Sequence, residues 1–226
     1  MKFGKNYKKV AELVDSTKVY SIKEACDLVK KTSTVKFDAT VDVSFHFNVD
    51  TTQADQQIRG TLILPNGNGK SKKICAITSK VEDAKAAGAD FAGGKELIEK
   101  IQKENWFEFD VIVATPEMMG ELGKIARILG PKGLMPNPKA GTVAPDIAKA
   151  IKEFKLGKVE YRLDKDANMH LSIGRVSFDS AKLVENLEAL VSTLLRVRPA
   201  AVKGTYIKNA VVHTTMGPSI HFAIGE

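Results

Sequence analysis

The hydrophobic pattern changes twice along this chain, and the change restricts the folds that the chain can adopt. In the outer thirds apolar and polar residues alternate, which is typical of strands with one exposed face. In the middle third two short unbroken apolar runs, residues 74–77 and 109–114, stand between helical patterns, which is typical of a buried parallel sheet. The longest alternating stretch is residues 37–49, and its apolar face carries Phe37, Ala39, Val41, Val43, Phe45 and Phe47. The pattern predicts an α/β protein in two parts.

We expect the middle third to form its own domain, inserted into a first domain built from both ends of the chain. The predicted first domain is discontinuous, residues 1–66 plus 157–226, and the inserted domain is residues 67–156. The run 65–69, with Gly67 and Gly69, has the composition of a turn or hinge, and Gly157 follows the inserted domain. With 226 residues and 43% hydrophobic content, the chain can supply two cores.

Local signals predict several further elements. Ser21 with Glu24 is a capping box that begins a helix, and Thr115 with Pro116 is a helix cap with proline at the first helical position. Pro199 ends a long helix with an apolar face. We also expect a Gly-rich loop at residues 88–94, a helix at 145–154, a hairpin of strands 159–163 and 169–173, and two last strands at 205–212 and 219–224.

Residues 129–143 form an unusual segment in the middle third. Its glycines and prolines exclude a long helix or a central strand, and its lysines, Lys132 and Lys139, have no acidic residue nearby in sequence. We expect a shaped, basic surface loop. A structural Ω-loop and a binding loop both fit this composition.

Composition narrows the class of protein. The net charge is +7, but acidic and basic residues are interspersed, so the charge permits an anionic partner without requiring one. The two cysteines, Cys26 and Cys75, lie far apart in apolar stretches and are expected to be buried thiols in a reducing compartment. The first residues lack a signal-peptide pattern, and no apolar run is long enough for a membrane span, so we expect a cytoplasmic protein without a membrane partner.

No catalytic, cofactor or metal motif is visible in the sequence. Gly69-Lys70-Ser71 resembles the end of a phosphate-binding loop, but Leu64 stands where that motif needs its first glycine, and no G-x-G-x-x-G follows either apolar run. The four histidines, His46, His170, His213 and His221, are expected to be partly exposed strand residues. We therefore expect no enzyme, no cofactor and no metal. A nucleotide-using enzyme and a DNA-binding or general nucleic-acid chaperone remain the alternatives.

Two polar surfaces suit RNA. The face of the long strand opposite its apolar side carries Lys36, Asp38, Thr40, Asp42 and Ser44, next to Phe37 at its start. A predicted hairpin tip carries Thr214, Thr215 and Met216, and Gly217 would allow close backbone approach. Hydroxyl groups and bare backbone fit the 2′-OH-rich minor groove of folded RNA better than a DNA major groove. An ordinary solvated sheet face is the alternative interpretation.

Five separated segments, taken together, resemble one family. They are residues 36–41, 55–60, 130–143, 174–178 and 215–218. In this order they resemble the large-subunit ribosomal protein family called L-one, in its bacterial form, over nearly the whole chain. The resemblance implies a first domain of split β-α-β topology that binds large-subunit rRNA, and an inserted, three-layer Rossmann-like domain.

The resemblance also implies function and site residues. Such proteins form the mobile stalk of the large ribosomal subunit beside the E site, assist movement and release of E-site tRNA, and repress their own operon by binding its mRNA. Members are expected to be monomers when free. The rRNA- and mRNA-binding residues would be Lys36, Phe37, Thr40, Thr214, Thr215, Met216 and Gly217, with Lys132 and Lys139 touching tRNA or peripheral rRNA and Gly67, Gly69 and Gly157 acting as hinges.

Overall fold

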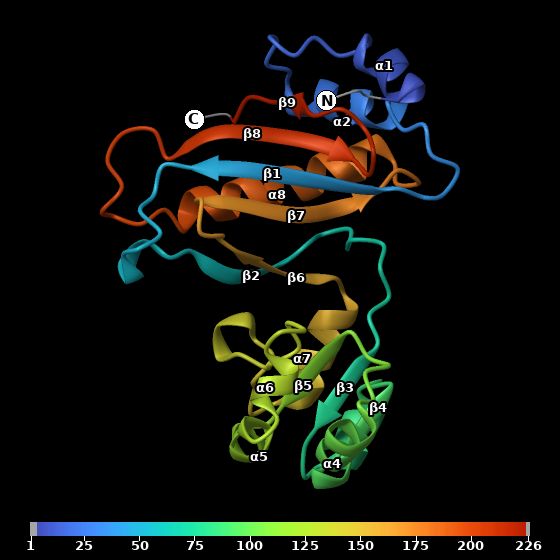
Figure 1. Ribbon diagram of the computed structural model, residues 1–226, viewed down its shortest axis with the longest axis vertical. Coiled ribbons are helices and arrows are strands. Elements are labelled where there is room, and N and C mark those ends of the chain that lie inside the picture. Colours follow the sequence, from blue (N-terminus) through green and yellow to red (C-terminus); the bar gives the residue numbers. More distant parts are fainter. Residues whose placement is uncertain (1–3, 225–226) are drawn as a thin grey trace. The chain divides into compact units, whose positions relative to one another are not determined.

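The computed structural model describes residues 4–224 (Figure 1). Contacts divide the chain into two compact units. Unit 1 consists of the chain up to Gly69 together with the chain from Val159 onward, and unit 2 is Lys70–Lys158. The sequence placed these boundaries at residues 66/67 and 156/157.

Unit 1 is built on a four-stranded antiparallel sheet in the order β7-β1-β8-β9. Because β1 is antiparallel to both β7 and β8, these two strands run parallel with β1 between them, and α8 connects them (Figure 1). This is the expected split β-α-β topology. The elements are α1 (Lys5–Ala11), α2 (Ile22–Lys31), β1 (Thr40–Phe47), the 3₁₀ helix η1 (Ala54–Gln56), β2 (Arg59–Ile63), β6 (Lys158–Arg162), β7 (Asn168–Arg175), α8 (Ser180–Arg196), β8 (Ile207–Thr214) and β9 (Ile220–His221).

Helices α2 and α8 cover one face of this sheet and leave the other face open. Residues of β1 alternate between buried and half-buried, and Val41, Val43, Phe45 and Phe47 join the core with both helices. The capping box is confirmed, because the Ser21 side chain accepts from Glu24 N and the Glu24 carboxylate accepts from Ser21 N. The alternation was extended too far at its start, because β1 begins at Thr40 and Phe37 is 59% exposed.

The predicted hairpin of residues 159–163 and 169–173 is wrong. The turn between these strands exists, since Asp164 Oδ1 accepts from Asp166 N and Asn168 N at 2.9 and 2.7 Å. The two strands enter different sheets, however: β6 pairs with β2, and β7 pairs with β1. Local turn chemistry was present, but distant partners decided the pairing.

Asn186, on α8, is fully buried and binds three backbone groups of unit 1. Its Oδ1 accepts from Asn66 N at 3.0 Å, and its Nδ2 donates to Gly67 O at 2.9 Å and to Ile173 O at 2.8 Å. One buried amide therefore ties the segment that leaves unit 1 to α8 and to β7, with each of these polar groups satisfied.

Unit 2 is a three-layer, Rossmann-like α/β unit. Its sheet is parallel, in the order β4-β3-β5. Side chains from one face of the sheet pack with α4, α5 and α6, and side chains from the other face pack with α3 and α7. The elements are β3 (Ile74–Ile77), α3 (Val81–Ala86), β4 (Phe91–Gly93), α4 (Lys95–Glu104), β5 (Val111–Ala114), η2 (Pro116–Met118), α5 (Met119–Gly123), α6 (Ala126–Leu129), η3 (Pro138–Ala140) and α7 (Ile147–Lys155).

Two local predictions in unit 2 need correction. The expected Gly-rich loop at residues 88–94 contains the short strand β4, which pairs with β3. Pro116 does begin a helix, but that helix is a short 3₁₀ helix, and the Thr115 side chain makes no capping bond to it.

Residues 129–143 form a loop that is held in shape by hydrogen bonds within the loop, two of them made by side chains. Thr142 Oγ1 accepts from Asn137 N at 2.7 Å and Asn137 Oδ1 accepts from Lys139 N at 2.8 Å, around the short helix η3. Val143 forms a bridge to Ala114 at the end of β5. The loop is thus compact and anchored to the sheet of unit 2, as an Ω-loop is.

Both cysteines are buried free thiols, as expected, with Cys26 in unit 1 and Cys75 in unit 2. Burial raises the pKa of each thiol to about 12. Between Gly4 and Ile224 no helix is both long and apolar enough to cross a membrane. Within the same range no group of three or more His, Cys, Asp or Glu residues could hold a metal ion.

Candidate RNA-binding surface

The start of β1 and the tip after β8 lie against each other in unit 1. Thr215 N donates to Thr40 O at 3.1 Å, and Val41 pairs with Thr214 in the ladder of β1 and β8. Two motif segments more than half the chain apart thus meet at one end of the central strands of the sheet. We call Lys36, Phe37, Thr40, Thr215, Met216 and Gly217 the β1–β8 rim.

The tip is a tight turn with an unusual residue. Gly217 N donates to Thr214 O at 2.9 Å, which closes the turn, and Met216 has φ 69°. A non-glycine residue in this left-handed conformation costs about 1–3 kcal/mol. Met216 is also 75% exposed, so its thioether contributes little to the core. A strained backbone position that exposes an apolar side chain makes Met216 a candidate binding residue.

Gly217 and Thr214 are matched sterically within the turn. A Cβ on residue 217 would collide with Thr214 Oγ1, so this position requires glycine unless Thr214 moves. Thr214 itself is 1% exposed, and its hydroxyl has no hydrogen-bond partner within the described part of the chain, residues 4–224. The sequence placed Thr214 among the contact residues; the structure places its side chain inside, where it supports the turn and does not face solvent.

The segment before β1 is held by a motif to which sequence reasoning gave no role. Asp38 accepts from Ser177 N at 3.0 Å and from Ser177 Oγ at 2.9 Å, and its carboxylate lies 3.6 Å from Arg175 Nη1. Arg175 Nη1 also donates to Asp38 O at 3.3 Å. These contacts fix the backbone that presents Lys36 and Phe37. The signal was the motif at residues 174–178, which was noted only for its resemblance.

The rim offers shape and hydrogen bonds more than charge. Lys36 and Phe37 are exposed, Thr40 and Thr215 are half-buried, and the nearby Arg175 is engaged with Asp38. Thr215 Oγ1 reaches Thr40 O only at 3.5 Å, so its hydroxyl is available for a stronger partner. This set fits sugar edges and hydroxyl groups, with one lysine for a phosphate.

The histidines are less isolated than the sequence indicated. All four lie on the open face of the sheet, and Ser44 Oγ lies 2.9 Å from His170 Nδ1 and 3.5 Å from His213 Nε2. His170 Nε2 is also 4.0 Å from Asp164. All four are at least partly exposed strand residues, as expected; His170 and His213 share Ser44, while His46 contacts Asn168 and His221 contacts Asn209.

Lys132 and Lys139 lie in unit 2, and their side chains have different surroundings. The Lys132 ammonium sits over the Phe107 ring, 3.8 Å from its centroid. Lys139 is exposed next to Asn137, and only its backbone N–H is used there. Of the two, Lys139 is therefore the more accessible cation.

The three predicted hinge glycines all have positive φ: Gly67 at 65°, Gly69 at 72° and Gly157 at 95°. Gly67 and Gly69 are also held within unit 1, since Gly67 O accepts from Asn186 and Gly69 O accepts from Arg175 Nε at 3.0 Å. Their backbone conformation alone explains why glycine is needed there.

A rim with an exposed aromatic ring and thioether beside half-buried threonines, on an α/β scaffold, has the chemistry that suits the class of proteins that recognise folded RNA by shape. The model of the ribosomal protein L1p/L10e family matches residues 29–218. The large ribosomal subunit protein uL1 of Mesoplasma florum is 58% identical over 224 residues, which cover 99% of each chain. The chain therefore belongs to the ribosomal protein L1p/L10e family.

This result confirms the resemblance inferred from the five segments. It also confirms the expected location of the protein, the ribosome in the cytoplasm. The family is described as one of ribosomal proteins, so the comparisons give no support to the alternative of a nucleotide-using enzyme.

Proposed function

We propose that this ribosomal protein is a structural constituent of the large ribosomal subunit and binds the rRNA of that subunit through the β1–β8 rim, without enzymatic activity. The observation that carries the proposal is the backbone bond from Thr215 to Thr40, which joins two distant family motifs into one surface. The relative from Mesoplasma florum, described as a large-subunit protein, supports the assignment to that subunit.

Each rim residue has a role that follows from its chemistry. The exposed Phe37 ring packs against sugar edges, and Met216 supplies a flexible apolar contact beside it along the rim. The Thr40 and Thr215 hydroxyls bind 2′-OH groups, and Lys36 binds a phosphate. Gly217 lets the RNA approach the backbone closely.

A binding titration with a folded rRNA fragment tests the rim. Phe37→Ala and Met216→Ala are each expected to weaken binding by roughly tenfold, the loss of a buried apolar contact. Leu13→Ala is the matched control, because Leu13 is 58% exposed in unit 1 and lies outside the rim. Unchanged affinity in both rim variants contradicts the site. A scrambled RNA of the same length separates shape recognition from general charge binding.

We propose that the same rim represses translation of the protein's own operon by binding an rRNA-like structure in its mRNA. Phe37→Ala should then weaken binding to the operon leader and to rRNA by the same factor. In a translation reporter that carries the leader, Phe37→Ala should relieve repression while Leu13→Ala keeps it. Different factors for the two RNAs contradict a shared surface.

We propose that the protein forms the mobile stalk and assists movement and release of E-site tRNA, with Lys132 and Lys139 contacting tRNA or peripheral rRNA. Lys139→Ala should weaken the tRNA contact more than Lys132→Ala, because Lys132 is engaged with Phe107. Affinity for the isolated rRNA fragment should stay unchanged in both, as crosslinking and filter binding can measure. A loss of rRNA affinity contradicts this assignment.

We propose that Gly67, Gly69 and Gly157 permit movement between the units and that the free protein is a monomer. Asn186 and Arg175 bind the carbonyl groups of Gly67 and Gly69 in the conformation described, so movement at these two glycines would require these hydrogen bonds to break. Single-molecule distance measurements between dyes on the two units, with Gly157→Ala as the restricting variant, test the hinge. Sedimentation of the free protein tests the monomer.

A further inference from the structure

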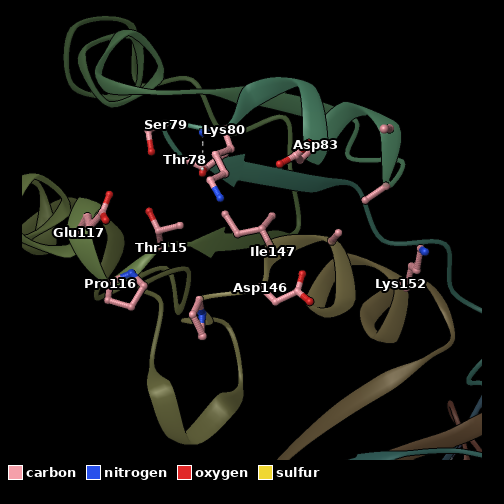
Figure 2. Close-up of a pocket in the computed structure, with 14 residues that line it drawn as sticks. Thr78, Ser79, Lys80, Asp83, Thr115, Pro116, Glu117, Asp146, Ile147 and Lys152 are labelled. Carbon is pink, nitrogen blue, oxygen red and sulfur yellow. Dashed lines mark hydrogen bonds between the residues drawn. The ribbon is translucent and has the colours of Figure 1, made fainter.

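Unit 2 contains a cavity of about 730 Å³ that the proposed rRNA contacts do not use (Figure 2). Two strand ends form much of its wall: Thr78-Ser79-Lys80 after β3 and Thr115-Pro116-Glu117 after β5. The start of α7 and part of α3 complete it. A cavity of this size is large enough for a nucleotide-sized ligand.

The cavity lies where the fold itself creates a crevice. From the end of β3 the chain continues to α3, which packs on one face of the sheet, while from the end of β5 it continues to α5 on the other face. Neighbouring parallel strands whose connections leave in opposite directions define a topological switch point. In open α/β sheets, ligands bind at this point, outside the carboxyl ends of the strands.

Several polar groups at the cavity lack partners. Thr115 Oγ1 is buried and has no hydrogen-bond partner among the residues that the structure describes, which is uncommon for a buried hydroxyl. Among residues 4–224, the ammonium group of Lys80 and the Glu117 carboxylate form no ion pair. Figure 2 shows Ser79, Thr115 and Glu117 on one side of the cavity, and Lys80 extending into its middle above Ile147.

The mixture of charges restricts the ligand. The lining carries three carboxylates, Asp83, Glu117 and Asp146, and two ammonium groups, Lys80 and Lys152. A polyphosphate would face more negative than positive charge there, and neither strand end has a glycine-rich phosphate loop. A ligand with one phosphate, several hydroxyl donors and an apolar face matches the lining.

We propose that this cavity binds a ribonucleoside monophosphate unit. Lys80 binds the phosphate, Glu117 accepts hydrogen bonds from the ribose hydroxyls, and a ribose oxygen accepts from the Thr115 hydroxyl. The base lies against the apolar wall that includes Ile147. The unit is supplied either as a free nucleotide or as a nucleotide turned out of an RNA chain, since both present the same groups.

Titration of the full-length, isotope-labelled protein with adenosine monophosphate tests the proposal. We expect saturable changes in the backbone amide signals of Thr78, Lys80 and Thr115, with the signals of the β1–β8 rim unmoved. Lys80→Ala should weaken binding at least tenfold, the loss of one charge-assisted contact. Lys85→Ala, at an exposed position of α3 outside the cavity lining, should leave it unchanged.

Two further measurements define the ligand. Glu117→Ala should remove the preference for the ribose monophosphate over its 2′-deoxy analogue. A short single-stranded oligoribonucleotide that shifts the same amides identifies an RNA chain as the source, while binding of the mononucleotide alone identifies a free nucleotide.

No saturable change at millimolar nucleotide in a folded protein, or equal affinity in Lys80→Ala and wild type, overturns the proposal. Thr115→Val keeps the shape, removes an unpartnered hydroxyl and should fold normally, so weaker binding in this variant reports on the ligand contact. All cavity residues belong to unit 2, so this test can fail while the rRNA proposal holds, and the reverse.

Discussion

Unit 1 and unit 2 both combine strands with helices, but they leave different places open for binding. In unit 1 the helices cover one face of an antiparallel sheet, and the candidate site lies at the end of two central strands, where the turn after β8 meets the start of β1. In unit 2 helices cover both faces of a parallel sheet, so the strand ends remain open and form a cavity. The direction of the strands therefore decides whether a unit offers a rim or a pocket.

The largest expected effect tests whether the units are stable independently. Asn186→Leu removes three hydrogen bonds and leaves buried backbone groups of unit 1 unpaired, which should cost about 3 kcal/mol of its unfolding free energy. The single tryptophan, Trp106, lies in unit 2, so its fluorescence reports on that unit alone. In a urea titration of the variant, circular dichroism should show a transition at lower urea than in the wild type, while the midpoint of the Trp106 fluorescence should not change.

Asn209→Ala is the control, because Asn209 is exposed and its side chain contacts His221 on the sheet surface, so the change should stay within about 0.5 kcal/mol. Fluorescence and circular dichroism midpoints that fall together in Asn186→Leu would show one cooperative molecule and contradict the comparison.

The next effect tests whether the rim depends on its backbone shape. Gly217→Ala should weaken rRNA binding roughly thirtyfold, or about 2 kcal/mol, because the new Cβ collides with Thr214 Oγ1. Thr214→Ala alone should bind normally, and the double variant should recover most of the affinity. Failure of the double variant to recover means that the collision is not the cause. Gly123→Ala in unit 2, where a Cβ meets open space, is the matched glycine control.

Alkaline pH should lower the stability of the two units to different extents, and this difference is smaller than the effects above. Burial raises the pKa of each thiol from 9.0 to about 12. The neutral thiol therefore contributes its full share to the folding stability of its unit below pH 9, and this contribution is lost as pH rises from 9 toward 12. In this pH range each thiol should lower the free energy of unfolding of its unit by about 1.4 kcal/mol per pH unit. Unit 1 should lose more than unit 2 above pH 10, because burial also raises the pKa of its Tyr206.

Urea titrations at several pH values, followed by the two spectroscopic signals, measure these slopes. Cys75→Ala should flatten the fluorescence slope and leave the slope of unit 1 unchanged. Equal slopes for both units would contradict the contribution of Tyr206.

The smallest effect concerns the strain at Met216. Met216→Gly should raise the stability of unit 1 by up to about 1 kcal/mol, because glycine adopts φ 69° without steric cost. The same change should weaken rRNA binding, since the exposed side chain is lost. Thermal unfolding and the binding titration on one sample measure both. Stability and affinity that fall together would show that Met216 serves the fold.

The sequence predicted what depends on neighbouring residues and missed what depends on distant ones. The capping box at Ser21, the buried run of β3 and the buried cysteines follow from local pattern, and the structure agrees. The pairing of β6 with β2 and the short strand β4 depend on residues far along the chain, and local turn or glycine signals pointed elsewhere.

The candidate sites divide in the same way. Motif resemblance brought Thr40 and Thr215 into one hypothesis, and the structure places them in contact. It could not show that Thr214 points inward, because a tight turn can bury either neighbour of its tip. The cavity of unit 2 was missed, since Thr78–Lys80 and Thr115–Glu117 match no motif and meet only when β3 and β5 pair.

The three hydrogen bonds of the buried Asn186 side chain, which we call the Asn186 clamp, have a consequence for engineering. Because it fixes the backbone at Asn66 and Gly67, extra residues between Leu64 and Gly69 would pull the clamp apart, whereas a spacer placed after Gly69 would leave unit 1 undisturbed. Unit 1 therefore has a defined splice junction at Gly69 and Val159. Another folded domain could be inserted at this junction in place of unit 2, so unit 1 can serve as a scaffold for chimeric RNA-binding proteins.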